Sequence, residues 1–214
     1  MKQTICGLAV LAALSSAPVF AHQEGDFIVR AGIASVVPND SSDKVLNTQS
    51  ELAVNSNTQL GLTLGYMFTD NISFEVLAAT PFSHKISTSG GELGSLGETK
   101  HLPPTFMVQY YFGEANSAFR PYVGAGLNYT TFFDESFNGT GTNAGLSDLK
   151  LDDSWGLAAN VGFDYMLNDS WFLNASVWYA NIETTATYKA GADAKSTDVE
   201  INPWVFMIAG GYKF

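Results

Sequence analysis

Five charged residues stand at alternate positions of otherwise apolar segments, each within a few residues of a short turn or a chain end. They are Arg30, Glu75, Arg120, Asp164 and Lys213. Two carboxylates in such a setting could work as a general acid and base. Three cations share the set, however, and mutual neutralisation of opposite charges in a tight space is the simpler chemistry. The set therefore predicts a charge plug that closes one end of a lumen against ions and water.

Histidine is the other residue type that could do chemistry. Three histidines follow residue 21, at His22, His84 and His101, and no cysteine does. Their spacing fits no metal site. His84 and His101 could face each other across a polar stretch, beside Ser83 or Asp134, and act as enzyme residues at a rim. We keep this as an alternative and expect no enzyme activity, no cofactor and no metal.

The first 21 residues, MKQTICGLAVLAALSSAPVFA, have the pattern of a secretory signal peptide. Lys2 precedes an apolar core too short to cross a bilayer, which argues against the alternative of a membrane anchor. The expected domains are thus a signal peptide, 1–21, and one domain, 22–214. Without Lys2 the formal charge of −11 becomes −12, which argues against nucleic acid as a partner.

The rest of the chain shows strict alternation of apolar residues. QLGLTLGYMF places Leu60, Leu62 and Leu64 on one face and small or polar residues on the other. The same period of two recurs in DFIVRAGIA, ISFEVLAATPF, TFMVQYYF, RPYVGAGLNYT, WGLAANVGFDYML, WFLNASVWYA and the C-terminal VFMIAGGYKF. Such alternation is typical of strands with one apolar face. We expect eight of them.

The connections alternate in length, because short turns at 69–71, 113–118 and 168–170 separate long polar stretches near 38–56, 83–100, 134–152 and 188–199. Short turns at one end, long loops at the other and an even strand count predict an all-β fold, an eight-stranded antiparallel up-and-down transmembrane β-barrel. Aromatic residues near both ends of the strands suit two membrane interfaces. The alternative is a soluble sandwich or small ligand-binding barrel, whose outer face would carry more charge.

The last strand can pair with the first, so Phe214 would lie at the membrane interface rather than fray. The pattern of this strand also resembles the C-terminal signature that the barrel assembly machinery recognises in outer-membrane proteins. The expected partners are therefore that machinery and the lipid of the outer membrane.

By alternation the lumen receives an apolar set, namely Ile28, Leu77, Met107, Phe132, Met166, Phe172, Trp178, Val205 and Met207. Core packing and passage of apolar solutes are both open, since eight strands leave an interior just wide enough for side chains. Leu77 and Trp178 would lie roughly 12–16 Å above the short turns, near mid-membrane, as a channel constriction.

Several stretches resemble the outer membrane protein W (OmpW) family of Gram-negative bacteria. They are NTQLGLTLGYMFTDNISFEVLAATPF, HLPPTFMVQYYFG, FRPYVGAGLNYTTFF, AGLSDLKLDDSWG and INPWVFMIAGGYKF. The resemblance implies a barrel with a hydrophobic channel for small apolar molecules, and it favours passage over packing alone. The alternative is a closed structural or adhesive barrel whose loops contact phage, bacteriocin or host.

Three prolines indicate where an apolar solute could leave the lumen. Pro81 ends one expected strand, and Pro103 and Pro104 begin its neighbour, so three backbone donors are missing from this hairpin's outer half. A charge plug below makes a periplasmic exit costly for an apolar solute. We therefore predict a lateral opening into the membrane framed by these prolines, beside Phe82 and His101. The alternative is that the prolines only end the strands.

Overall fold

The computed structural model describes residues 21–39, 41–42, 52–88 and 94–214. The predicted signal peptide lies outside these residues apart from Ala21. No helix in the described part of the chain has the length and hydropathy to span a membrane.

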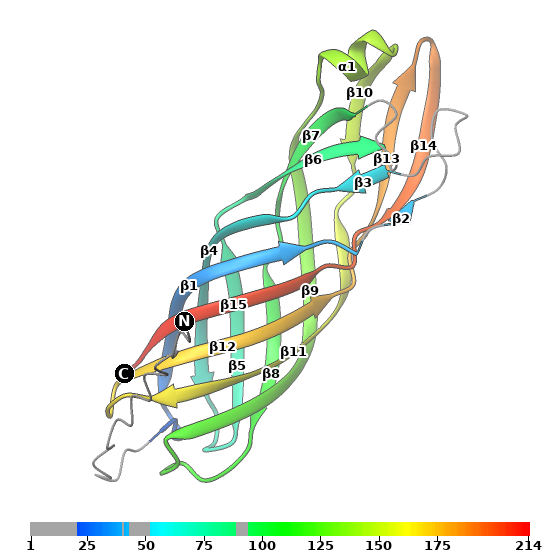
Figure 1. Ribbon diagram of the computed structural model, residues 1–214. Helices are drawn as coiled ribbons and strands as arrows, with labels where there is room; N and C mark the ends of the chain where they lie inside the picture. Colours follow the sequence, from blue (N-terminus) through cyan, green and yellow to red (C-terminus); the bar gives the residue numbers. More distant parts are fainter. Residues whose placement is uncertain (1–20, 40, 43–51, 89–93) are drawn as a thin grey trace, which may run out of the picture.

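Eight antiparallel strands form a closed ring. In ring order they are β1 (Phe27–Val37), β4 (Asn57–Met67), β5 (Ile72–Ala79), β8 (Thr105–Tyr111), β9 (Phe119–Phe137), β11 (Ser154–Met166), β12 (Trp171–Ala180) and β15 (Trp204–Lys213). The ring closes between the last strand and the first, from the pair Ile28–Lys213 to the pair Val37–Trp204, and the amide of Phe214 donates to the carbonyl of Phe27 at 2.9 Å. The predicted barrel and its closure by the C-terminal strand are confirmed (Figure 1).

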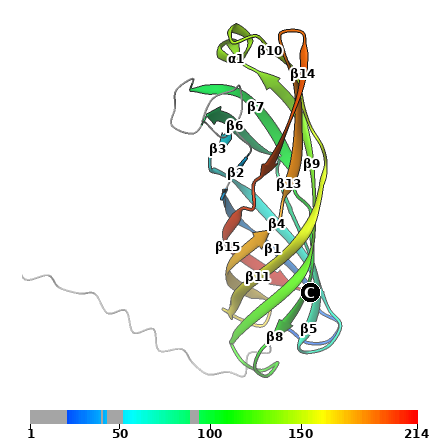
Figure 2. The same cartoon turned by 90° about the vertical axis from the view of Figure 1, so that its right-hand side faces the viewer.

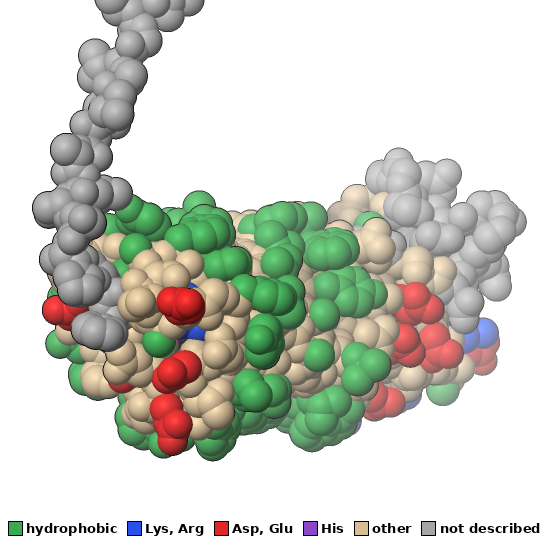
Figure 3. Space-filling model, turned by 90° about the horizontal axis from the view of Figure 1, so that it is seen from below, with side chains coloured by type: hydrophobic (Ala, Val, Ile, Leu, Met, Phe, Trp, Pro, Cys, Tyr) green, Lys and Arg blue, Asp and Glu red, His purple; other side chains and the backbone are tan. Residues whose placement is uncertain are grey.

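The exposed side chains of the ring are the apolar ones. Ile208 and Leu157 are 74% and 72% exposed, whereas Arg30, Glu75 and Asp164 are at most 1% exposed. Figure 3 shows apolar side chains around the middle of the face in view and acidic side chains towards both ends. This inversion of burial is what lipid on the outside and a filled lumen on the inside require, so the alternative of a soluble barrel or sandwich is wrong.

Further strands continue the wall beyond one end of the ring (Figures 1 and 2). They are β2 (Ser41–Ser42), β3 (Leu52–Val54), β6 (Phe82–Thr88), β7 (Ser95–Leu102), β10 (Leu146–Leu151), β13 (Glu183–Ala190) and β14 (Asp193–Glu200), with the short helix α1 (Gly139–Asn143). We call this part the extracellular extension. The loops predicted over 83–100, 134–152 and 188–199 are therefore wrong in their described parts. Both faces of these segments carry polar residues, which weakened the alternation that reveals strands. Most of the stretch 38–56 lies outside the described residues.

Candidate functional site

The lower lumen, near the short turns, holds a buried network around Arg30 on β1. Its guanidinium forms an ion pair with Glu75 on β5 and binds Asp164 on β11, with Nη2 2.6 Å from Oδ2 and Nε 3.2 Å from Oδ1. The same Nη2 donates to the hydroxyl of Tyr111 at 2.6 Å. All four side chains are essentially inaccessible to solvent. The network fills this level with paired charges and leaves few free hydrogen-bonding groups.

The other two residues of the predicted charge plug take different partners. Arg120 donates to three backbone carbonyls, of Phe112, His22 and Asp70, at 3.1, 3.2 and 2.6 Å. Lys213 donates to the carbonyl of Ala21 and to Asp26. The structure thus brings Arg30, Glu75 and Asp164 into one ion-paired group. It places Arg120 and Lys213 at the rim, where they hold turns and the N-terminal segment.

Three further members of the network were not predicted from the sequence. Nε2 of His22 lies 2.6 Å from Oδ2 of Asp164, Gln109 donates to Glu75 at 2.9 Å, and Asn174 donates to Asp164 at 2.7 Å. Gln109 and Asn174 stand at inward positions of their strands, so alternation could have found them. No periodicity could have found His22, because it precedes the first strand.

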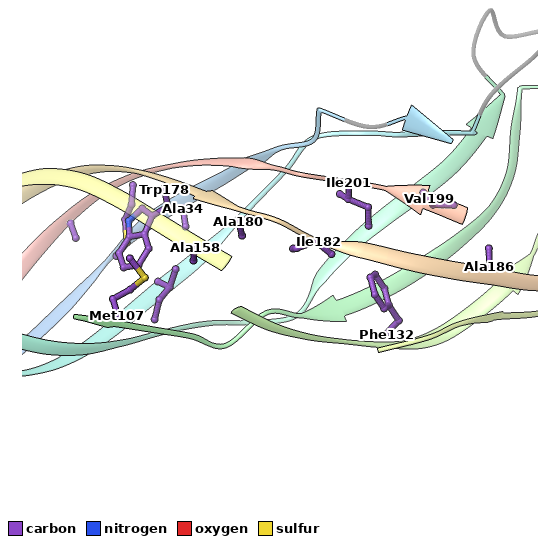
Figure 4. Close-up of a cluster of buried hydrophobic side chains, with 13 residues drawn as sticks. Ala34, Met107, Phe132, Ala158, Trp178, Ala180, Ile182, Ala186, Val199 and Ile201 are labelled. Atoms are coloured by element: carbon purple, nitrogen blue, oxygen red, sulfur yellow. The ribbon is translucent and has the colours of Figure 1, made fainter. Parts of the chain in front are cut away.

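Above this level the lumen is mainly apolar, although buried polar residues such as Asn160 and Ser176 also face it. Leu77 and Trp178 belong to one buried cluster with Met107 and Met207, and Val205 packs against it. Figure 4 shows Trp178 beside Met107 at the left of this cluster and Phe132 towards the right, on the part of β9 that pairs with β7 of the extracellular extension. Of the other predicted lining residues, Ile28, Met166 and Phe172 form a second buried cluster at the level of the charged network. The lining residues therefore form two groups.

Two cavities lie above Leu77 and Trp178. The lower cavity encloses about 530 Å³ of empty space, counting the part open to solvent, and touches Leu77, Trp178, Phe82, His101 and Pro103. The upper cavity, of about 760 Å³ on the same measure, lies in the extracellular extension. Its wall is mainly aliphatic and aromatic, with Ile86, Leu96, Phe132, Phe137, Leu146 and Ile201 among its members. Because His101 lines both cavities, they adjoin.

The prolines flank an interruption in the sheet. The ladder between β5 and β8 ends at the pair Leu77–Thr105, and pairing resumes between β6 and β7 at Phe82–His101. Pro81 lies on one side of this interruption, and Pro103 and Pro104 lie on the other. The strands on the two sides of the interruption are held by their other neighbours. On the Pro81 side, the amide of Thr80 donates to the carbonyl of Leu60 on β4.

The proline carbonyls are also held on that side. The carbonyl of Pro104 accepts from the amide of Tyr129 at 3.0 Å, and that of Pro103 accepts from the hydroxyl of Thr105 at 3.1 Å. Both carbonyls are therefore satisfied, one by β9 and the other by a side chain. The interruption separates two otherwise well-anchored pairs of strands.

The two histidines of the extension lie in the cavity wall. Their rings stack 4.9 Å apart at 13°, and His101 also stacks on Phe82. Burial lowers the pKa of His84, and burial with the neighbouring His84 lowers the pKa of His101 to about 3. Within the described residues, neither imidazole is joined to a carboxylate, and no group of three or more metal-ligating side chains occurs. Asp134 instead pairs with Lys100.

An eight-stranded ring with an apolar outside, a charged lower lumen and apolar cavities above defines a transmembrane β-barrel of the outer-membrane type. The chain belongs to the OmpW family, whose model matches residues 23–214.

Known proteins agree with this assignment. The chain is 98% identical over 217 residues to outer membrane protein W of Vibrio cholerae, with all of both chains covered. It is 27% identical over 219 residues to the dibenzothiophene metabolism operon protein PahQ of Pseudomonas aeruginosa, again over the full length of both. The crystal structure of outer membrane protein OprG from Pseudomonas aeruginosa superposes with a TM-score of 0.86 at 47% identity, covering 92% of this chain and 99% of that one. The protein is located in the outer membrane of a Gram-negative bacterium, surrounded by lipid.

Proposed function

We propose that the protein conducts small hydrophobic molecules passively from outside the cell into the outer membrane. The solute enters the upper cavity, passes His101 into the lower cavity and leaves sideways between the proline-flanked strands. One observation carries this proposal. The lower cavity touches both the apolar floor at Leu77 and Trp178 and the edges of the ladder interruption at Ala79 and Pro103.

The lower lumen favours a sideways exit over a straight one. A solute that continued downwards would have to displace the paired groups of Arg30, Glu75 and Asp164, none of which is exposed. An apolar molecule cannot replace the hydrogen bonds that these groups would lose, so the cost of separating them is uncompensated. Lipid beside the interruption presents no such cost.

One relative supports apolar cargo. The name of PahQ places that protein in an operon for dibenzothiophene metabolism, and dibenzothiophene is an uncharged fused-ring molecule. A cavity lined by aliphatic and aromatic side chains, as in this chain, suits solutes of that chemistry.

A disulfide across the interruption tests the route. Ala79 and Pro103 stand opposite each other when the β5–β8 register is continued, and both line the lower cavity. The mature chain is expected to lack cysteine, so an A79C/P103C variant would carry the only pair. Oxidation should abolish uptake of an apolar fluorescent dye by vesicles with lipopolysaccharide in the outer leaflet, and reduction should restore it.

A V76C/F106C variant is the matched control, because Val76 and Phe106 are paired in the closed part of the same ladder. Its oxidation should leave uptake unchanged. Full uptake with the A79C/P103C bridge verified would exclude the lateral route. Uptake no faster than in empty vesicles for the unmodified protein would exclude a conduit altogether and favour a closed barrel that serves as a contact surface.

A further inference from the structure

One buried polar atom of a residue that lines the upper cavity has no partner. His84 on β6 is 2% exposed, and its Nδ1 lies 2.5 Å from the backbone carbonyl of Asn55. A carbonyl oxygen can only accept, so Nδ1 must carry the hydrogen. Burial lowers the pKa of His84, so the ring is neutral near neutral pH. Its Nε2 is therefore an unprotonated acceptor, which finds no hydrogen-bond partner among the described residues.

The surroundings of His84 offer no substitute donor. Two hydroxyl-bearing residues line the same cavity, and neither bonds to Nε2 of His84: Thr99 donates to the carbonyl of Lys100 at 3.3 Å, and Tyr188 is the other. The ring of His101 stacks face to face on His84, and the rest of the wall is mostly apolar. A buried acceptor without a partner is costly and rare in folded proteins, so it needs an explanation, and a ligand that donates to it would supply one. The atom has less than 1 Å² of accessible surface, so such a ligand must displace a neighbouring side chain of the wall.

We propose that Nε2 of His84 selects, among small apolar solutes, those that carry one hydrogen-bond donor, such as phenols, alcohols and indole-type N–H groups. This inference rests on the proposed function, because it assumes that apolar solutes enter the upper cavity. It narrows their chemistry from hydrocarbons in general to apolar bodies with a single donor.

Because Nδ1 carries the hydrogen, Nε2 can only accept, and the site therefore favours solutes that donate a hydrogen bond. A hydroxyl or N–H group can donate to Nε2, whereas an ether oxygen would oppose one lone pair with another. A site built around a hydrogen bond discriminates strongly against the analogue that lacks the group, because its own polar atom then remains unpaired. The carbonyl of Asn55 and the ring of His101 hold the imidazole in one orientation, which favours this discrimination.

Three solutes of the same ring system test the proposal: 2-naphthol as donor, 2-methoxynaphthalene as acceptor only, and naphthalene. Dissociation constants are measured for the full-length protein in lipid nanodiscs. For each variant, the dissociation constant of one solute is divided by that of another. These ratios are then compared between variants, because partition of each solute into lipid is the same for all variants and cancels. The preference is the ratio of the naphthalene dissociation constant to the 2-naphthol dissociation constant. We expect this ratio to be about tenfold higher in the unmodified protein than in H84L. H84Q should restore part of the preference, since its amide can accept. T99V, which alters the same wall without exposing an acceptor, should leave the preference unchanged.

Nitrogen NMR of the His84 ring gives a second, direct readout. The free protein should show Nδ1 protonated and Nε2 unprotonated, and 2-naphthol but not naphthalene should shift the Nε2 resonance towards that of a hydrogen-bonded nitrogen. If both solutes perturb the methyl signals of Ile86 and Leu96 while Nε2 stays unchanged, the inference is wrong and the proposed conduit stands. A proton found on Nε2 would also overturn the inference. If no solute perturbs the cavity and no dye is taken up, the conduit itself fails.

Discussion

Replacing Arg30 by Met should strongly destabilise the barrel. The guanidinium is the group that pairs with both Glu75 and Asp164, and the carboxylates are 1% and 0% exposed. Methionine preserves much of the volume and removes the charge. Both carboxylates would then remain buried without their main counter-ion.

The cost follows from known buried pairs. Removing one partner of such a pair typically destabilises a protein by about 3–5 kcal/mol, because the remaining charge has lost its compensation. We therefore expect R30M to lower the free energy of unfolding by about that amount. The triple variant R30M/E75Q/D164N should recover most of it, since neither carboxylate charge stays buried and the amides can still bond to Gln109 and Asn174.

Guanidinium unfolding in lipid vesicles, followed by tryptophan fluorescence and extrapolated linearly to water, measures the difference. K100M is the control, because Lys100 pairs with Asp134 where the two side chains are 48% and 63% exposed. Such a pair contributes about 1 kcal/mol or less. A loss for R30M no greater than that for K100M, or a triple variant as unstable as R30M, would refute the reasoning.

Three further predictions concern the lumen wall, the ladder and pH. L77A/W178A should raise single-channel conductance with folding intact, and unchanged conductance would mean that both residues only pack. G126A should cost roughly 1–3 kcal/mol in the same unfolding assay, because its methyl would meet a neighbouring backbone carbonyl, whereas G210A, with open space, should be neutral. For His101, with its pKa near 3 when packed and near 6.5 when exposed, the opened state binds the extra proton between these values. Stability should therefore fall as pH falls from 6.5 to 3, seen as smaller hydrogen-exchange protection factors in β6 and β7. H101F should weaken this dependence, and the remainder should come from His84, whose pKa burial also lowers.

The sequence by itself determined the barrel. Alternation with period two follows directly from strand geometry, because successive side chains point to opposite faces. It therefore assigned Leu60, Leu62 and Leu64 to the lipid side and Met107 to the lumen without any knowledge of the partner strands. The ring also followed, since an even number of such strands in lipid must close to satisfy its edges.

Local pattern failed where both faces of a strand are polar. The extension strand β6 alternates inward and outward residues, but His84 at an inward position and Lys85 at an outward one both read as loop residues. Its pairing with β7 lies outside the lipid, where apolar residues are not required on the outer face. The hairpin formed by β13 and β14 was missed for the same reason.

Only the tertiary structure decided which groups meet inside the lumen. Parity places Arg30, Glu75, Arg120 and Asp164 on the inner wall, but it fixes neither their height nor their angle around the ring. Those depend on the register and tilt of eight strands, which decide that Arg30 pairs with Glu75 and Asp164 while Arg120 binds carbonyls. The unpaired Nε2 of His84 is likewise invisible in sequence, because it depends on a contact with Asn55, 29 residues away along the chain. Alternation is a local property, whereas these contacts arise from closing the ring.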